Sequence, residues 1–147
     1  MSKTHKQRFK RLESLVAQIS AATTTLSAAK QGIQFLRTSI AGAQTINIPA
    51  ATGKSGGFNI FIGVTATGNK VIKAAGSSLL QGTALMAGGT AGSFASASNS
   101  NTLTFNGTTQ GGIIGTLIEL RDVAPNVWQT KVSSVGSGIQ VTPFSNS

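Results

Sequence analysis

Alternating apolar and polar residues run through most of the chain and predict short β-strands. In residues 45–48 and 58–62 every second side chain is apolar, as expected for a strand with one buried face. The segment 58–62 is the most apolar and predicts a central strand. Pro49 ends the segment before it, because proline cannot donate to a sheet ladder. The predicted strands cover residues 24–27, 33–38, 45–48, 58–62, 70–73, 78–80, 102–106, 113–121, 127–133 and 139–142.

Turn-forming residues indicate how these strands follow one another. Residues 67–69, Thr-Gly-Asn, predict a hairpin into 70–73. A turn around Pro125 predicts a second hairpin, which joins 113–121 to 127–133. The segment 82–100 is mostly Gly, Ala, Ser, Thr and Asn, and is either a long surface excursion or a weak strand pair with a loop. Short strands with turns roughly every 8–12 residues predict a mainly β fold, an antiparallel β-sandwich or barrel that is jelly-roll-like.

The N-terminal segment has a different period and predicts a short α-helix over residues 4–20. Its apolar side chains fall at spacings of three and four, which defines a helix packing seam of Phe9, Leu12, Val16 and Ile19. A helix of about two heptads is marginal alone in water, so it must pack on its own body, on copies of itself or on another protein. We therefore divide the chain into a basic N-terminal arm with an amphipathic helix, residues 1–22, and a β-sandwich domain, residues 23–147.

Acidic residues are nearly absent, which bears on the class of protein. The 147 residues contain three acids, one His and no Cys, and no acid lies between Glu13 and Glu119. Most enzyme chemistry relies on carboxylates, imidazoles or thiols, so we expect a protein that is not an enzyme and has no cofactor, metal site or small-molecule substrate. The charged share of 10% is well below the usual value of about 25%. Such a surface is typical of a protein that partners cover.

The positive charge is concentrated at the N-terminus. The formal net charge is +9, which favours nucleic acid, an anionic membrane or an acidic protein surface as partner. No apolar run approaches the roughly 20 residues of a membrane span. The aromatic share is only 5%, and the sequence has no basic strand studded with aromatic residues, with which single nucleic-acid strands are bound. We therefore expect contact with an acidic protein surface, with no membrane partner and nucleic acid disfavoured. The predicted contact residues are Lys3, Lys6, Arg8, Lys10 and Arg11.

Residues 51–55, Ala-Thr-Gly-Lys-Ser, resemble the end of a phosphate-binding loop. The full motif requires a glycine five residues before Gly53, where this chain has Ile48, and a helix after the lysine. A glycine pair and a strand pattern follow instead. We interpret the segment as a turn that exposes Lys54.

The few remaining candidates for chemistry do not form a constellation. His5 lies in the basic arm, far in sequence from the two C-terminal acids. Alternation turns Glu119 outward beside Arg121, and Asp122 is placed to open a turn. Trp128 predicts a core anchor, with stacking on a carbohydrate as the alternative.

Three segments of the chain carry a resemblance to a known group of proteins. They are residues 23–36, which begin Thr-Thr-Thr-Leu-Ser, residues 44–62, which contain Thr-Ile-Asn-Ile-Pro, and residues 115–128, which end Asn-Val-Trp. From residue 23 onward the chain resembles small β-structured bacteriophage virion proteins described as head decoration, cement or head-fibre proteins. The N-terminal basic segment is not part of that pattern.

The resemblance implies a structural role. Such proteins bind the outside of an assembled capsid, often as trimers, and reinforce it. It therefore implies a homotrimer that binds the major capsid protein, is made in the host cytoplasm and resides on the outer capsid surface of the virion. Two alternatives stay open: a fibre or adhesin module for host recognition, with residues 82–100 as its candidate loop, and a nucleic-acid-binding accessory protein.

Overall fold

A computed structural model describes residues 16–28, 32–54 and 56–147, and every regular element in these ranges is a β-strand. The strands in chain order are β1 (Val16–Ile19), β2 (Thr23–Thr25), β3 (Ile33–Thr38), β4 (Gln44–Ile48), β5 (Gly57–Ile62), β6 (Lys70–Ala74), β7 (Leu79–Ala87), β8 (Gly92–Ala95), β9 (Thr102–Phe105), β10 (Leu117–Ala124), β11 (Val127–Val135) and β12 (Phe144–Ser145). The prediction of a mainly β fold is confirmed.

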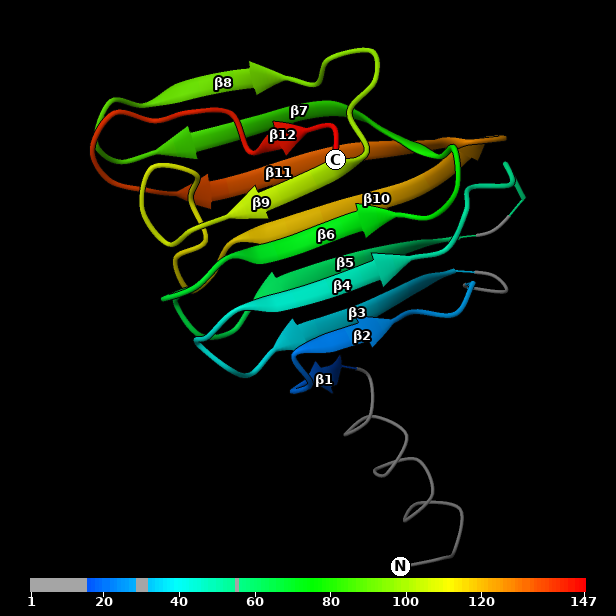
Figure 1. Cartoon of the computed structure of the whole chain (residues 1–147), viewed down its shortest axis with the longest axis horizontal. Helices are drawn as coiled ribbons and strands as arrows, with labels where there is room; N and C mark the ends of the chain where they lie inside the picture. The colour runs from blue at the N-terminus through cyan, green and yellow to red at the C-terminus, as the bar shows by residue number, and fades with distance from the viewer. Residues whose placement is uncertain (1–15, 29–31, 55) are drawn as a thin grey trace, which may run out of the picture.

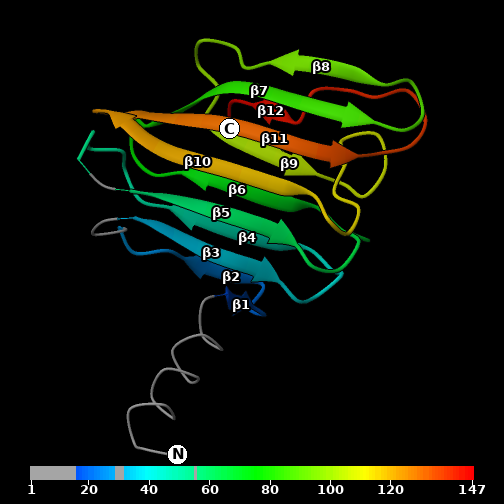
Figure 2. The same cartoon turned by 180° about the vertical axis from the view of Figure 1, so that it is seen from behind.

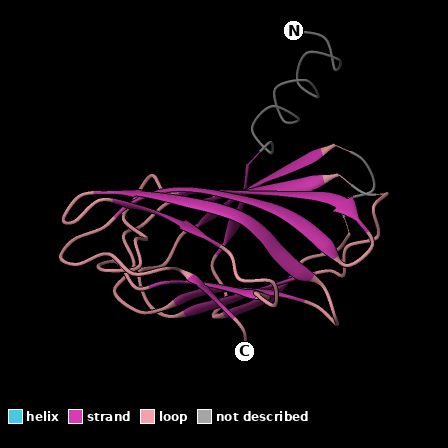
Figure 3. Cartoon of the chain, turned by 90° about the horizontal axis from the view of Figure 1, so that it is seen from above, coloured by secondary structure: helices cyan, strands magenta, loops and turns pink. Residues whose placement is uncertain are grey.

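The strands form two mixed sheets, which Figure 3 shows as two layers. The seven-stranded sheet has the order β1-β3-β5-β10-β11-β7-β8, and the five-stranded sheet has the order β12-β9-β6-β4-β2. Figure 1 views the molecule from the side of the five-stranded sheet, and Figure 2 views it from the side of the seven-stranded sheet. Five of the ten strand pairs are parallel, so the expectation of a purely antiparallel fold is wrong.

The first six strands wind as a coil that alternates between the sheets. Strands β1, β3 and β5 lie side by side and parallel in one sheet, while β2, β4 and β6 do the same in the other. The predicted hairpin at residues 67–69 is therefore wrong, because it joins β5 to β6 across the two layers (Figure 1). Its turn residues reverse the chain without pairing the flanking strands.

Strands β7 to β12 extend both sheets. Strand β10 pairs antiparallel with β5 and with β11, so the hairpin predicted around Pro125 is confirmed. Strand β7 pairs parallel with β11 and antiparallel with β8. Of the two options for residues 82–100, the strand pair with a loop is the one observed.

Alternation along the strands builds one apolar cluster from both sheets. In β5 the side chains of Phe58, Ile60 and Ile62 are almost fully buried, and in β4 those of Ile46 and Ile48 are as well. Burying side chains of this size stabilises the fold by about 1.5–3 kcal/mol each. The cluster therefore lies between the two layers and fixes which face of each strand points inward.

The predicted N-terminal helix is wrong for the residues that the structure describes. Residues 16–19 form β1, which pairs parallel with β3 through Val16 and Phe35 at one end and Ile19 and Thr38 at the other. Two members of the proposed seam therefore face opposite sides of a strand: Ile19 is buried in the core and Val16 is 44% exposed. Pairing with β3 and burial of Ile19 outweigh the weak helical preference of a short segment. Phe9 and Leu12 lie outside the described residues.

Candidate functional site

The glycine-rich loop that resembles a phosphate-binding loop holds a carboxylate of its own chain. The backbone N–H groups of Thr52 and Gly53 donate to Asp122 at 3.1 and 2.6 Å, and the Thr52 hydroxyl donates to the same carboxylate at 3.1 Å. Asp122 is 9% exposed and points inward from β10. The prediction that Asp122 opens a turn is wrong, because β10 continues to Ala124. The loop therefore uses its donors to fasten two distant parts of the fold.

Glu119, the other acid among the described residues, lies on the outward side of β10 as predicted. Its carboxylate is 3.8 Å from a guanidinium nitrogen of Arg121 and directly opposite Lys131 on β11. These three residues and Gln129 line an open hollow of about 170 Å³. Glu119 and Asp122 thus point to opposite faces of one strand and do not form a carboxylate pair.

The described ranges contain neither a cluster of metal-ligating side chains nor a helix that could span a membrane. No group of three His, Cys, Asp or Glu side chains occurs in residues 16–28, 32–54 and 56–147. Within the same residues no helix is long and apolar enough to cross a bilayer.

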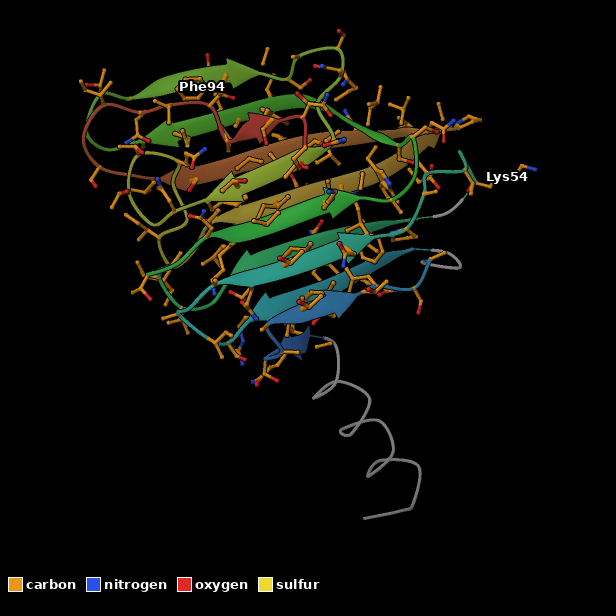
Figure 4. All side chains as sticks on the ribbon, viewed as in Figure 1. Lys54 and Phe94 are labelled. Atoms are coloured by element: carbon orange, nitrogen blue, oxygen red, sulfur yellow. The ribbon has the colours of Figure 1, made fainter. Side chains whose placement is uncertain are left out.

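Trp128 is a core anchor, as predicted. Its side chain is fully buried, its ring packs against Phe58 at a centroid distance of 5.6 Å, and its indole N–H donates to the carbonyl of Pro49 at 3.0 Å. The indole is therefore not available for stacking on a carbohydrate. Phe94 lies on β8 (Figure 4) and packs partly against the core.

A buried lysine of β6 bonds to the connection between β3 and β4. Lys70 is 1% exposed, and its ammonium group donates to the carbonyls of Ile40 (2.6 Å) and Gly42 and to the side chain of Gln44 (2.9 Å). Gln44 in turn donates to the carbonyl of Ile19 at 3.0 Å. Burial lowers the pKa of Lys70 below its ordinary value of 10.5. Among the described residues, three oxygen acceptors hold this cation, and none of them is a carboxylate. We therefore assign Lys70 a role in stabilising the fold.

An open hollow lies beside the β7–β8 hairpin. It has a volume of about 420 Å³ and is lined by Leu85, Met86, Ala87, Ala91, Gly92, Ser133 and Ser134. The hydroxyl of Ser134 is already bonded to the amide of Gly112 and the hydroxyl of Thr116. None of the lining side chains is ionisable, so the hollow offers contact area without acid–base chemistry.

The outward side of the seven-stranded sheet combines exposed apolar side chains with cations. Ile33 and Phe35 of β3 are 41% and 39% exposed, although both are large and apolar. Arg37 follows on the same strand and is exposed as well. Alternation along Ile33–Thr38 indicates from the sequence that every second residue of β3 points outward, because Leu36 and Thr38 take the inward positions.

Two arginines on this side lie over Gly57, the first residue of β5, and Gly63, the residue that follows β5. A Cβ atom on Gly57 would come within 3.0 Å of Cδ of Arg121, and one on Gly63 within 2.8 Å of Cδ of Arg37. Arg121 also donates to the carbonyls of Phe58 and Leu120, at 3.3 and 3.0 Å. At both glycines a Cβ atom would first meet a backbone carbonyl oxygen, that of Leu120 or Thr38, so the close approach of the neighbouring backbone already requires glycine there, and the arginines also lie over these positions.

Between the two glycines lies a polar side chain with an unused acceptor. Asn59 points outward from β5, opposite Phe35 on one side and Glu119 on the other, yet it is only 9% exposed. Its Oδ1 atom has no hydrogen-bond partner in the described part of the chain. We call the surface formed by Phe35, Arg37, Asn59, Phe61 and Arg121 the arginine face.

The predicted capsid-contact residues lie outside the described residues. These are Lys3, Lys6, Arg8, Lys10 and Arg11. Lys54 is exposed, as predicted, and projects from the edge of the body in Figure 4. The arginine face was not identified from sequence, since the pairing of β3, β5 and β10 that assembles it spans Phe35 to Arg121.

Comparisons with protein-family models, curated proteins and solved structures gave no match.

Proposed function

We propose that this chain is a structural virion protein that decorates the outer surface of an assembled phage head and stabilises it. In this proposal the chain is not an enzyme, and the major capsid protein is its partner. The two layers serve as a β-sandwich-type body, and three copies associate as a homotrimer. The sequence resemblance described above motivates this choice of class.

The observation that carries the proposal is the way the described body uses its charges. Asp122 is bonded to the loop at Thr52 and Gly53, and Lys70 is bonded to turn carbonyls. The buried charges therefore fasten the fold and are not gathered around a cavity. What remains outward is a broad sheet with exposed apolar side chains and three cations. This distribution of charges supports the proposal that the protein acts by binding the surface of another protein.

Decoration would stabilise a head by mass action. A protein that binds neighbouring capsid subunits in the assembled lattice, and not the separated subunits, favours the lattice. The basic arm at residues 3–11 would steer and hold the chain on an acidic exterior, because charge complementarity accelerates docking. The two other classes, a host-recognition module and a nucleic-acid-binding accessory protein, have no comparable support. The burial of Trp128 removes the strongest sugar-stacking candidate.

Cryo-electron microscopy of purified particles tests the proposal directly. We expect density for this chain on the outside of the shell, at positions that repeat with the capsid lattice. Density inside the shell beside the genome, or at a fibre tip, would contradict it.

Two variants test whether the basic arm contacts the head. Changing Lys3, Lys6, Arg8, Lys10 and Arg11 together to glutamine removes five charges and leaves the length unchanged. We expect weaker head binding and a smaller dependence of affinity on salt, since exposed charges are screened by ions. Deletion of residues 1–15 should act in the same way, and it keeps β1, whereas deletion of residues 1–20 would also remove β1. Unchanged affinity and salt dependence would show that the arm does not contact the head.

A further inference from the structure

We propose that the arginine face is a docking surface for an acidic protein surface, which on the function proposed above is the exterior of the capsid lattice. This inference rests on that proposed function and adds a second contact to the basic arm. It starts from three positions along β5 and its end: Gly57 and Gly63, each with an arginine side chain over it, and the outward Asn59 between them.

Arg121 is held in place before any partner arrives. Both arginine side chains lie over a glycine, and the guanidinium of Arg121 also donates hydrogen bonds to two backbone carbonyls. Six residue steps separate Gly57 from Gly63, which places the two seats roughly 20 Å apart at about 3.3 Å per step. A side chain that is ordered in the free protein loses less conformational entropy when it binds. A partner would therefore meet Arg37 and Arg121 as two separate contacts.

Asn59 is a polar side chain within this face that has an unused acceptor. A buried polar atom without a hydrogen bond costs about 1–3 kcal/mol, so such atoms are rare without a reason. Oδ1 of Asn59 is an acceptor on the outward side of the sheet, between Phe35 and Glu119. Because Asn59 is almost fully buried, this acceptor lies beneath the exposed side chains of the face and not on its surface.

The apolar component favours a protein over a nucleic acid. Val16, Ile33 and Phe35 are 44%, 41% and 39% exposed, and they lie on the same side of the sheet as the arginines. Arginine and aromatic residues are enriched in protein interfaces. Nucleic-acid interfaces are much more positively charged, and here Glu119 projects from the same side.

Charge also argues against a second copy of this chain as occupant. This side of the sheet carries Arg37, Arg121 and Lys131 against the single acid Glu119, which already lies beside two of them. Two such faces brought together would oppose like charges, which is unfavourable in an interface. An acidic partner would compensate the surplus.

The arginine face, on β3, β5 and β10, is part of a larger outward side formed by all seven strands of the sheet. Seven strands at about 4.8 Å spacing give a width of roughly 29 Å, and with a length of about 20 Å the area is roughly 600 Å². A standard interface uses about 800 Å² from each partner. The outward side of the whole sheet would supply about three quarters of that area.

Head binding by matched variants of the full chain tests the assignment. The probe is heads of the phage that encodes the chain, prepared without it. The face variant is R37Q/R121Q, and the control is K54Q/K73Q, whose lysines lie on an exposed loop and on the outward side of the five-stranded sheet. Both lower the formal net charge from +9 to +7. We expect the face variant to bind at least about tenfold more weakly, as for loss of two charge-assisted contacts, and the control to stay within about twofold of the wild type.

An uncharged pair extends the test if R121Q fails to fold, which thermal unfolding would reveal. Phe35→Ser removes the exposed aromatic ring of the arginine face, and Val141→Ser removes an apolar side chain of similar exposure elsewhere. The first should weaken head binding and the second should not.

The remaining outcomes separate the two proposals. If the wild type binds heads and the face variants bind equally well, the docking surface is wrong and the proposed function stands. If the wild type does not bind heads, the proposed function is wrong and this assignment falls with it. Loss of binding to random-sequence double-stranded DNA in R37Q/R121Q but not in K54Q/K73Q would reassign the face to nucleic acid. Loss of a trimer in sedimentation, again only in R37Q/R121Q, would reassign it to contact between copies.

Discussion

The amide of Gly53 donates a hydrogen bond of 2.6 Å to the carboxylate of Asp122, 69 residues away in the sequence. Thr52 adds two further bonds to the same carboxylate. We predict that Asp122→Ala lowers the free energy of unfolding by about 2–4 kcal/mol, because charge-assisted bonds are lost and buried donors lose their acceptor. Chemical denaturation measures the change.

The control for that substitution is Glu119→Ala, which removes the same charge from the outward side of the same strand. It should change the free energy of unfolding by less than about 1 kcal/mol, as is usual for an exposed ion pair. Equal effects of the two substitutions would mean that the loop does not depend on Asp122.

The buried ammonium of Lys70 predicts a second stability effect. Lys70→Met leaves the carbonyls of Ile40 and Gly42 and the side chain of Gln44 without this donor. We expect a loss of about 1–3 kcal/mol at pH 7, since unsatisfied buried acceptors outweigh the relief of burying a charge. Lys73→Met, on the outward side of the same strand, should be nearly neutral. A more stable Lys70→Met protein would contradict this reading.

The same lysine predicts a dependence of stability on pH. Burial lowers the pKa of Lys70 below 10.5 in the folded state, so between that lowered value and 10.5 the unfolded chain binds more protons than the folded one. The free energy of unfolding must therefore rise with pH in this window. Denaturation at pH values from 7 to about 10 should show the rise in the wild type and in Lys73→Met, but not in Lys70→Met. A fall with pH in the wild type would refute it.

Trp128 predicts both a spectroscopic and a stability result. As the single tryptophan, fully buried, it should emit at shorter wavelength in the folded protein than in denaturant. Trp128→Phe loses the bond to the carbonyl of Pro49 and should destabilise by about 1–3 kcal/mol. Phe94→Leu, at a partly exposed site, should cost less than about 1.5 kcal/mol. Emission typical of exposed indole in the folded protein would contradict the burial.

The start of the folded body is open to a truncation test. Removing residues 1–15 leaves every strand of the described structure, whereas removing residues 1–20 also takes away β1 and the buried side chain of Ile19. We expect the longer deletion to be less stable by about 2–5 kcal/mol, as for loss of a buried isoleucine. Equal stability of the two truncated chains would place the start of the body after β1.

Local alternation was enough to locate most strands. The strand Ile33–Thr38 was predicted with its observed bounds, and 58–62 differs from β5 by one residue. The prediction at 113–121 begins too early, because residues 113–116 form a loop in which Thr116 bonds to the carbonyl of Ile113. Positions such as these depend on tertiary contacts that alternation does not report.

Strand pairing was not available from sequence patterns. Alternation states which side of a strand is buried, and it does not state which strand lies next to it. The parallel partners β3 and β5 are separated in the chain by β4, which belongs to the other sheet. The helix at 4–20 failed at its described end for a related reason: Val16 and Ile19 fit a helical spacing, while pairing with β3 decides the outcome. The arginine face needed all of these pairings to be known.

The coil of the first six strands has a consequence for how this protein can change its length. Adding or deleting one whole turn, a strand in each layer with its two connections, would keep every remaining side chain on its present side and widen or narrow both layers together. A single-residue insertion within Ile33–Thr38 would instead turn the side chains that follow it to the opposite side of the sheet. A change of length by whole turns would therefore preserve the inward and outward sides of both sheets.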